Sequence, residues 1–362
     1  MKVVGTIVEY NPLHNGHLYA INKIRELSKA DIIIAILSGN YTMRGDLSIF
    51  DKFEKTRQAL KASIDLVIEL PFVLAVQHSD VFAKNAIKQL YLAGVQEVWI
   101  GSESNNPKLY ENCYKNWKKE ESQEKIKSLL ALGKSYKEAT ASIIDLPSND
   151  LLGFCYYKAI QECQFEMRLH TIQRVGNYNS LETGTYASAY AIRNNLSLMD
   201  DFCPSYVNSS FIRDSNLLFP YLKYQILSLS TEELKHIFFV EEGIENRLKN
   251  INTFFTLKDF IDFLSTKRYT KSRIQRMLAY ILFQIKKSDM SSLSEYSILR
   301  ILGYSPNGKK YLSTLKKKTW IQTNIKEGIH PILDFELKIT KILDMIYSST
   351  MLKDEQGKPQ EI

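Results

Sequence analysis

Short apolar runs alternate with longer amphipathic stretches over the first half of the chain. The runs are nearly continuous and rich in β-branched residues, which is typical of parallel strands covered on both faces. The predicted strands span residues 3–8, 31–37, 65–70, 97–101 and 166–172, and the helices predicted between them span residues 16–29, 51–62, 79–92 and 149–163. Because strands and helices alternate, we predict an α/β fold built on a doubly wound parallel sheet with right-handed crossovers.

The pattern changes near residue 200. From about residue 214 onward, apolar residues recur at three- and four-residue spacing, as in "KSRIQRMLAYILFQIKK", and this spacing is typical of amphipathic helices. We therefore predict two domains, one over residues 1–200 and an all-α domain over residues 214–350. The last stretch, residues 351–362, is polar, and we expect it to be frayed.

Composition narrows the class of protein. Of the 362 residues, 44% are hydrophobic, which allows a proper core and argues against disorder. The four cysteines show no CxxC spacing, so we expect neither a disulfide framework nor a bound structural metal ion. The sequence has no run of about 18 uncharged apolar residues, and Glu9 interrupts the first apolar run too early for a signal peptide. We therefore expect a cytoplasmic protein without a membrane span.

Two histidines with a glycine between them stand where the first predicted strand meets the first predicted helix. In "VGTIVEYNPLHNGHLYAIN" these are His14, Gly16 and His17. Ligands of doubly wound sheets bind at the carboxyl ends of strands, and a helix N-terminus there offers free N–H groups to phosphate. The glycine would let the backbone approach an anion, and both imidazoles would donate to phosphate oxygens. The spacing therefore predicts a phosphate site; the alternative is a pair of ordinary surface histidines at a helix cap.

The opening motif is part of a longer, ordered set. "GTIVEYNPLHNGH" resembles the HxGH signature of the nucleotidylyltransferase superfamily, whose members bind ATP on a Rossmann-like sheet. With it, "LSGNYTMRGD", "DLVIELP", "WIGSE", "PSNDLLG" and "KRYTKSRIQRML" resemble the bacterial tRNA(Met) cytidine acetate ligase family over nearly the whole chain. The resemblance implies a Rossmann-like HxGH core followed by an α-helical domain that helps to hold tRNA.

The resemblance also implies a two-step reaction. Acetate attacks the α-phosphate of ATP, giving acetyl-adenylate and pyrophosphate. The amine of the wobble cytidine of elongator methionine tRNA then attacks the acetyl carbonyl, giving N(4)-acetylcytidine and AMP. His14 and His17 would be the catalytic residues that stabilise phosphate charge in the first step. The expected partners are ATP, acetate and tRNA, with Mg²⁺ accompanying ATP and with neither DNA nor a membrane.

A set of ATP contacts follows from the same resemblance. Gly101 would leave room for a nucleotide over the sheet edge, Asn149 can offer a donor and an acceptor to an adenine or ribose edge, and Arg174 can clamp phosphate. A strand-end turn, a helix cap and a solvated arginine are the respective alternatives. The implied contacts are Ile7, Val8, Glu9, Tyr10, Asn11, Pro12, Leu13, His14, Asn15, Gly16, His17, Leu18, Tyr19, Ala20, Gly101, Asn149 and Arg174.

Further candidates lie in two other loops and at one strand end. "ASAYAIRNN" resembles the superfamily's second phosphate motif through Ser188 and Arg193, whereas a tyrosine stands where that motif usually has threonine. In "SGNYTMRGD", after the second predicted strand, Arg44 or the backbone amides near Gly39 are candidates to hold acetate; a loop without a ligand is the alternative. Glu9 is a candidate magnesium ligand, and a helix-capping or packing role fits it equally well.

Basic residues gather in two stretches of the helical half. The net charge of +7 is too small to indicate nucleic-acid binding by itself. In "KRYTKSRIQR" two arginines three residues apart would share one helix face, and in "GKKYLSTLKKKTW" three lysines stand beside Tyr311 and Trp320. Basic residues interleaved with aromatic ones suit RNA contact, and a solvated face is the alternative. The candidate tRNA contacts are Arg273, Arg276, Lys316, Lys317 and Lys318.

Two other classes of function fit parts of the sequence. A small-molecule adenylyltransferase of the HxGH superfamily would share the opening motif, but the long helical extension argues against it. A non-catalytic RNA-binding protein with a relict nucleotide fold would have no need of the intact HxGH motif. We therefore predict an ATP-dependent tRNA-acetylating ligase.

Overall fold

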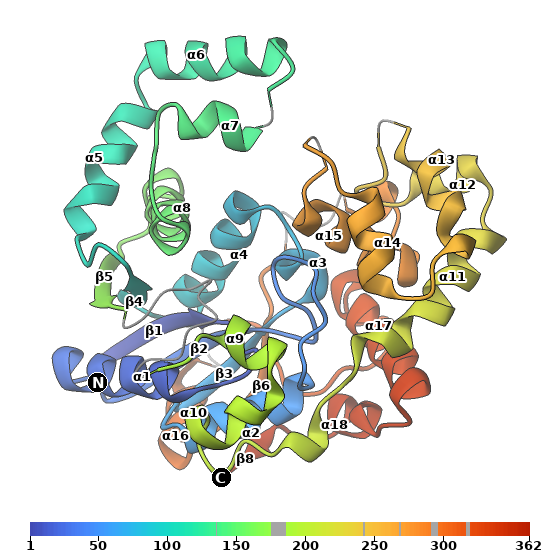
Figure 1. Ribbon diagram of the computed structural model, residues 1–362. Coiled ribbons are helices and arrows are strands. Elements are labelled where there is room, and N and C mark those ends of the chain that lie inside the picture. Colours follow the sequence, from blue (N-terminus) through green and yellow to red (C-terminus); the bar gives the residue numbers. More distant parts are fainter. Residues whose placement is uncertain (135, 175–185, 242, 268, 291–295, 316–318) are drawn as a thin grey trace.

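An eight-stranded sheet forms the centre of the molecule (Figure 1). The computed structural model describes residues 1–134, 136–174, 186–241, 243–267, 269–290, 296–315 and 319–362. The five predicted strands are confirmed to within two residues at each end, and they run parallel in the order β5-β4-β1-β2-β3. Their bounds are β1 (Val3–Val8), β2 (Ile32–Ser38), β3 (Leu66–Leu70), β4 (Glu97–Ser102) and β5 (Arg168–Gln173).

Helices cover both faces of this sheet, as the continuous apolar strands require. Every residue of β2 from Ile32 to Leu37 is at most 1% exposed, which is the signature of a central parallel strand. Figure 1 shows α4 and α8 on one side of the sheet and α2 on the other. The predicted helices are confirmed as α1 (Asn15–Ser28), α2 (Lys52–Lys61), α4 (Ser79–Leu92) and α8 (Ser148–Glu162), and a short α3 (Phe72–Ala75) precedes α4.

The strand order reverses at β1, which lies between β2 and β4. At such a switch point the loops that leave neighbouring strands turn toward opposite faces, and a crevice opens outside the strand ends. After β4 the chain forms three helices that project away from the sheet before it returns through α8 (Figure 1). These helices are α5 (Pro107–Trp117), α6 (Glu120–Ala131) and α7 (Tyr136–Ala141).

The second half of the chain is mostly helical, as predicted, and α11 to α15 gather in a lobe beside the sheet (Figure 1). None of the helices in the described residues is long and apolar enough to cross a membrane. The helices of this half are α9 (Ala189–Asn194), α10 (Met199–Phe202), α11 (Phe219–Ser228), α12 (Thr231–His236), α13 (Ile244–Leu248), α14 (Leu257–Leu264), α15 (Lys271–Leu282), α16 (Pro306–Leu315), α17 (Pro331–Tyr347) and α18 (Met351–Gln356).

The expectation that this half is entirely α-helical needs correction, because it returns to the sheet. Strand β6 (Leu299–Tyr304) pairs antiparallel with β3, and the short β7 (Ile321–Gln322) and β8 (Gln360–Glu361) pair parallel with β6. The apolar run of β6 is too short for its periodicity to separate a strand from a helix. It covers the edge of β3, which would otherwise present unpaired backbone groups.

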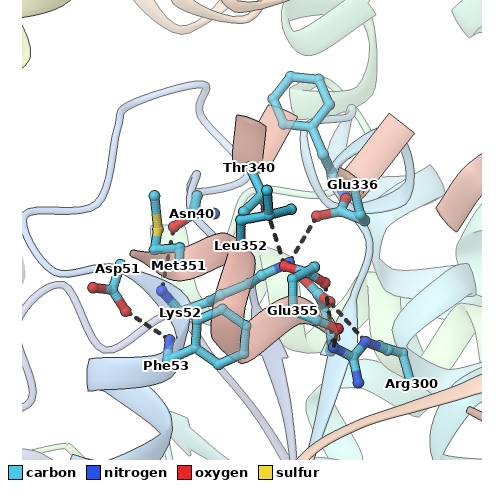
Figure 2. A network of polar contacts seen from close by, with 12 residues as sticks. Asn40, Asp51, Lys52, Phe53, Arg300, Glu336, Thr340, Met351, Leu352 and Glu355 are labelled. Atoms are coloured by element: carbon cyan, nitrogen blue, oxygen red, sulfur yellow. Dashed lines mark hydrogen bonds and ion pairs between the residues drawn. The ribbon is translucent and has the colours of Figure 1, made fainter. Parts of the chain in front are cut away.

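A buried cluster of charges joins the two halves of the chain (Figure 2). The ammonium group of Lys52, in the first turn of α2, lies 2.7 Å from Glu69 of β3, 2.7 Å from Glu355 of α18 and 3.3 Å from Glu336 of α17. Arg300 of β6 lies 3.3 Å from Glu355. All five side chains are at most 2% exposed, so each charge depends on the others for its stabilisation.

Three carboxylates in this cluster face two cations. Burial raises the pKa of Glu69 to about 8, and the nearby carboxylates of Glu336 and Glu355 add to the rise against the opposing effect of Lys52. Burial alone would raise the pKa of Glu355 too, but Lys52 and Arg300 hold it below its ordinary value. The cluster therefore holds one more carboxylate than cations, and the pKa of Glu69 is raised while that of Glu355 is lowered.

The polar tail predicted to be frayed is ordered instead. Residues 351–356 form α18, and Glu355 is fully buried, accepting a hydrogen bond from the Thr340 hydroxyl at 3.0 Å. The many polar residues in this stretch indicated a solvated end, whereas one of them, Glu355, completes the charge cluster.

We predict that Lys52→Met strongly destabilises the protein. The substitution removes the cation shared by three buried carboxylates, and breaking a buried ion pair from one side typically costs about 3–5 kcal/mol. Lys341→Met is the matched control, because Lys341 is half-exposed and lies 3.8 Å from Glu327, a surface pair worth about 0–1 kcal/mol. Urea unfolding of both variants measures the difference, and equal midpoints would show that the cluster does not hold the halves together.

Candidate active site

A pocket of about 390 Å³ lies at the switch point, against the carboxyl ends of β1 and β4. Its floor is made by residues 6–11 at the end of β1, and one wall by Ile100 and Gly101 at the end of β4. Residues at the start of α1 and at the start of α8 line it as well. Its volume is in the range of small-molecule and nucleotide sites.

The two histidines of the opening motif cap α1 reciprocally. His14 is the N-cap, and its Nδ1 accepts the Gly16 N–H at 3.1 Å, while Nδ1 of His17 accepts the His14 N–H at 3.2 Å. The imidazole ring centroids lie 3.8 Å apart. Because both Nδ1 atoms accept backbone protons, each neutral ring carries its own proton on Nε2. The cap therefore leaves two Nε2–H donors for a ligand in the pocket.

Both imidazoles are neutral before a ligand enters. Burial lowers the pKa of His14 to about 3, and the positive charges of Arg174 and Arg193 add to this effect. Burial also lowers the pKa of His17 well below its ordinary value, with His14 and Arg174 contributing. An incoming triphosphate would bring negative charge close to the rings and would move both pKa values upward again.

Gly16 serves the cap in a way that the sequence did not reveal. A Cβ at this position would come 2.9 Å from Cε1 and 3.0 Å from Nδ1 of His14. The absence of a side chain therefore lets the His14 ring fold back over the first turn of α1, which is what places the two rings side by side.

Most of the implied ATP contacts come together in this pocket. Four do not line it: Leu13, which is part of the core, and Pro12, Asn15 and Leu18. The amide of Asn15 donates to the Asp201 carbonyl at 3.4 Å. The implied contacts that line the pocket are Ile7, Val8, Glu9, Tyr10, Asn11, His14, Gly16, His17, Tyr19, Ala20, Gly101, Asn149 and Arg174.

The second phosphate motif reaches the same pocket through its arginine. Arg193 lines the pocket and donates from Nη1 to the Asn11 carbonyl at 2.6 Å, which ties α9 to the opening loop. Ser188 caps α9 by accepting the Ala191 N–H at 3.0 Å, and Tyr190 is 41% exposed. The serine thus has a helix-capping role, and the arginine is the member of the motif that faces the site.

Two of the predicted polar contacts already have protein partners. Glu9 accepts the Met43 N–H at 2.7 Å, so it holds the loop after β2 in place. Asn149 donates to Glu103 at 2.5 Å. Among the described residues, no group of three or more His, Cys, Asp or Glu side chains is arranged to hold a metal ion.

The loop after β2 contributes more to the pocket than predicted, and at other positions. Arg44 lines the pocket, but Gly39 does not: it is buried against Glu69. The expectation that amides near Gly39 hold acetate is therefore corrected. Asp46 and Thr42 of this loop do line the pocket. A carboxylate two residues after Arg44 was the signal available in the sequence.

Of the two α15 arginines predicted to contact tRNA, only one is partly exposed. Arg276 is 7% exposed and lies against His78 and Phe239, so the expectation that it shares a solvent face with Arg273 is corrected. Helical spacing defines the angle between two side chains but not which neighbour covers them. Arg273 keeps partial exposure, 3.2 Å from Glu241.

The second basic stretch is described only in part. Lys316, Lys317 and Lys318 lie outside the described residues. Tyr311 is buried and donates to the Ala93 carbonyl, so it cannot stack on a base, whereas Trp320 is 51% exposed.

The whole chain is similar to one family of known proteins. Residues 1–358 match the family model described as HIGH Nucleotidyl Transferase. The tRNA(Met) cytidine acetate ligase of Oceanobacillus iheyensis is 38% identical, with 94% of each chain covered, and that of Staphylococcus aureus strain MRSA252 is 36% identical, with 96% of each covered. Thermotoga maritima TmcAL superimposes over the full length of both chains, with a TM-score of 0.88 and 28% identity when bound to alpha-thio ATP and 0.90 and 29% without ligand. The chain therefore belongs to the tRNA(Met) cytidine acetate ligase family of HIGH nucleotidyl transferases.

Proposed function

We propose that this protein activates acetate with ATP and transfers the acetyl group to the wobble cytidine of elongator methionine tRNA, forming N(4)-acetylcytidine. The observation that carries the proposal is the pair of Nε2–H donors that His14 and His17 present at the switch-point pocket. The full-length similarity to cytidine acetate ligases supports it over a compact small-molecule adenylyltransferase. Because ATP and tRNA are cytoplasmic, we place the protein in the cytoplasm.

The first step joins acetate to the α-phosphate of ATP. A carboxylate oxygen attacks phosphorus, the bond to pyrophosphate breaks, and negative charge accumulates on the phosphate oxygens. His14 and His17 stabilise this charge through their Nε2–H groups, and Arg174 and Arg193 add fixed positive charge. Such donors act strongly because they are held in place before the reaction begins.

The second step releases AMP. Acetate by itself is a poor acyl donor, since an oxide ion leaves badly, whereas AMP leaves well. The cytidine N4 amine attacks the acetyl carbonyl, the bond between carbonyl carbon and phosphate oxygen breaks, and N(4)-acetylcytidine forms. We assign Arg44 to the acetate carboxylate, because it is the cationic side chain that the loop after β2 brings to the pocket.

Magnesium is expected to enter with ATP. The pocket offers the carboxylate of Glu9, which fits the preference of Mg²⁺ for one or two carboxylates together with water and phosphate oxygens. When bound, the ion would supply charge neutralisation at the phosphates.

We predict that His17→Ala abolishes acetyl-adenylate formation. Removing one preorganised donor typically costs on the order of 100-fold or more in rate. Incubation with ATP and labelled acetate measures this step, and mass spectrometry of nucleosides from methionine tRNA measures the complete reaction. His236→Ala is the control, because His236 is exposed in α12. Near-normal acetate-dependent turnover in the His17 variant would contradict the assignment, and wild-type protein that never acetylates tRNA would contradict the function itself.

We predict that Arg273→Gln weakens tRNA binding while ATP binding is unchanged. If Arg273 leaves Glu241 for a phosphate, its loss should reduce the log–log salt slope by about one unit at most. Arg276→Gln is the comparison: because Arg276 is buried, this variant should lose stability without a matching change in slope. Filter-binding titrations over a range of salt concentrations test both, and an unchanged slope for Arg273→Gln would remove this residue from the tRNA site.

A further inference from the structure

The loop after β2 forms a tight turn whose last residue faces the pocket. Thr42 donates its N–H to the Asp46 carbonyl at 2.9 Å, and its hydroxyl accepts the Asp46 N–H at 3.3 Å. Gly45 between them has a positive φ of 88°, and a side chain there would collide with the backbone nitrogen of Arg276. The turn therefore lies directly against the backbone of α15, and its geometry fixes where the Asp46 carboxylate points.

Helix α15 also holds the carboxylate itself. The Gln275 side-chain amide donates to Oδ1 of Asp46. Within the described part of the chain, no hydrogen-bond donor lies on the second oxygen, Oδ2. One carboxylate oxygen is thus anchored by the helical lobe, and the other is left for a ligand in the pocket.

The histidines and arginines of the pocket are poorly placed to accept a proton. His14 and His17 have their Nδ1 lone pairs occupied by backbone N–H groups and their own protons on Nε2, so neither ring has a free acceptor. Arg44, Arg174 and Arg193 are donors only. Glu9, like Asp46, has one oxygen engaged, in its case by the Met43 N–H, so it is the competing base that the test has to separate from Asp46.

We propose that Asp46 is the general base of the acetyl-transfer step, with Gln275 as the residue that positions it. This inference rests on the proposed function. As the cytidine N4 attacks the acetyl carbonyl, a C–N bond forms and the nitrogen becomes acidic. Oδ2 of Asp46 takes one N4 proton, the electron pair of the C–O bond leaves with AMP, and the proton then passes to solvent. The balance requires only acetyl-adenylate and the tRNA.

The charges around Asp46 suit this role. Burial raises the pKa of Asp46; the carboxylate of Glu9 adds to the rise, and Arg193 and Arg44 oppose it. A carboxylate whose pKa lies above its ordinary value is a stronger base than a free one, and general bases work best when their pKa approaches the working pH. His14, with its pKa lowered to about 3, resists protonation more strongly than Asp46 does.

The test separates the two half-reactions. Wild type and Asp46→Asn are incubated with ATP and labelled acetate until acetyl-adenylate has accumulated, and methionine tRNA is then added in a single-turnover assay. Asparagine keeps the shape and can still accept from Gln275, so adenylate should form as in wild type. Acetyl transfer should fall by about 100-fold or more. Transfer in wild type should rise with pH as the carboxyl loses its proton, and the asparagine variant should lack this rise.

Gln275→Leu tests the positioning role and remains informative if Asp46→Asn does not fold. The Gln275 amide stabilises the charged carboxylate, so its removal should raise the pKa of Asp46 further and move the pH profile of transfer to higher pH. At a pH below the midpoint of the profile the rate should fall roughly tenfold, as expected for losing a hydrogen bond to a charged group. A purely structural role would lower the rate without moving the profile.

Several outcomes overturn the proposal. Equal losses in adenylate formation and transfer for Asp46→Asn would mean that Asp46 serves ATP or its metal ion. An unchanged transfer rate would mean that it has no part in the step. A pH profile that survives in Asp46→Asn and disappears in Glu9→Gln would assign the base to Glu9. Wild-type protein that forms no acetylated tRNA would instead contradict the proposed function, and this inference with it.

Discussion

The structure depends on the burial of Lys52 among three carboxylates drawn from β3, α17 and α18. No member of the cluster could be buried alone. A buried charge without a partner loses the stabilisation of water and gains no ion pair in return, which raises the free energy of the folded state strongly. The sheet, the α17 helix and the last helix therefore have to come together for any of these charges to be tolerated. This constraint explains why the helical half does not behave as an appendage: it supplies two of the three acids and the strand that covers β3.

The same helix that begins with Lys52 also anchors the chain segments that line the switch-point pocket. Lys55, one turn on, is fully buried and donates to the carbonyls of Glu9 and Ser38 at 2.9 and 2.7 Å and to the Ser48 hydroxyl at 3.1 Å. These acceptors lie where β1 and β2 end and where the loop after β2 returns. The HxGH cap and the turn that carries Asp46 therefore share one support, and the core sets where Asp46 lies relative to His14 and His17.

The parts of this arrangement that are local in the chain could be predicted from the sequence. The HxGH motif was recognisable because its two histidines and its glycine lie within four residues at a strand–helix junction. Features that depend on contacts between residues far apart in the chain could not be predicted in this way. Asp46 is visible in the sequence as a carboxylate two residues after Arg44, but its contact with Gln275, 229 residues later, is not. Arg276 looked exposed because helical spacing does not reveal that the Gly45 turn lies against it, and β6 resembled a helix because only its neighbour β3 shows that the run is extended.

The late position of these partners has a consequence for synthesis on the ribosome. Glu336 is translated 284 residues after Lys52, and β6, which covers β3, also comes from the second half. A nascent chain that has completed its first five strands therefore carries an open sheet edge and an unfinished charge cluster. Open edges pair readily with other chains, and domains usually fold as they emerge. For this protein the Rossmann-like half becomes a closed unit only near the end of translation, so a stalled or truncated product would be a natural client of chaperones.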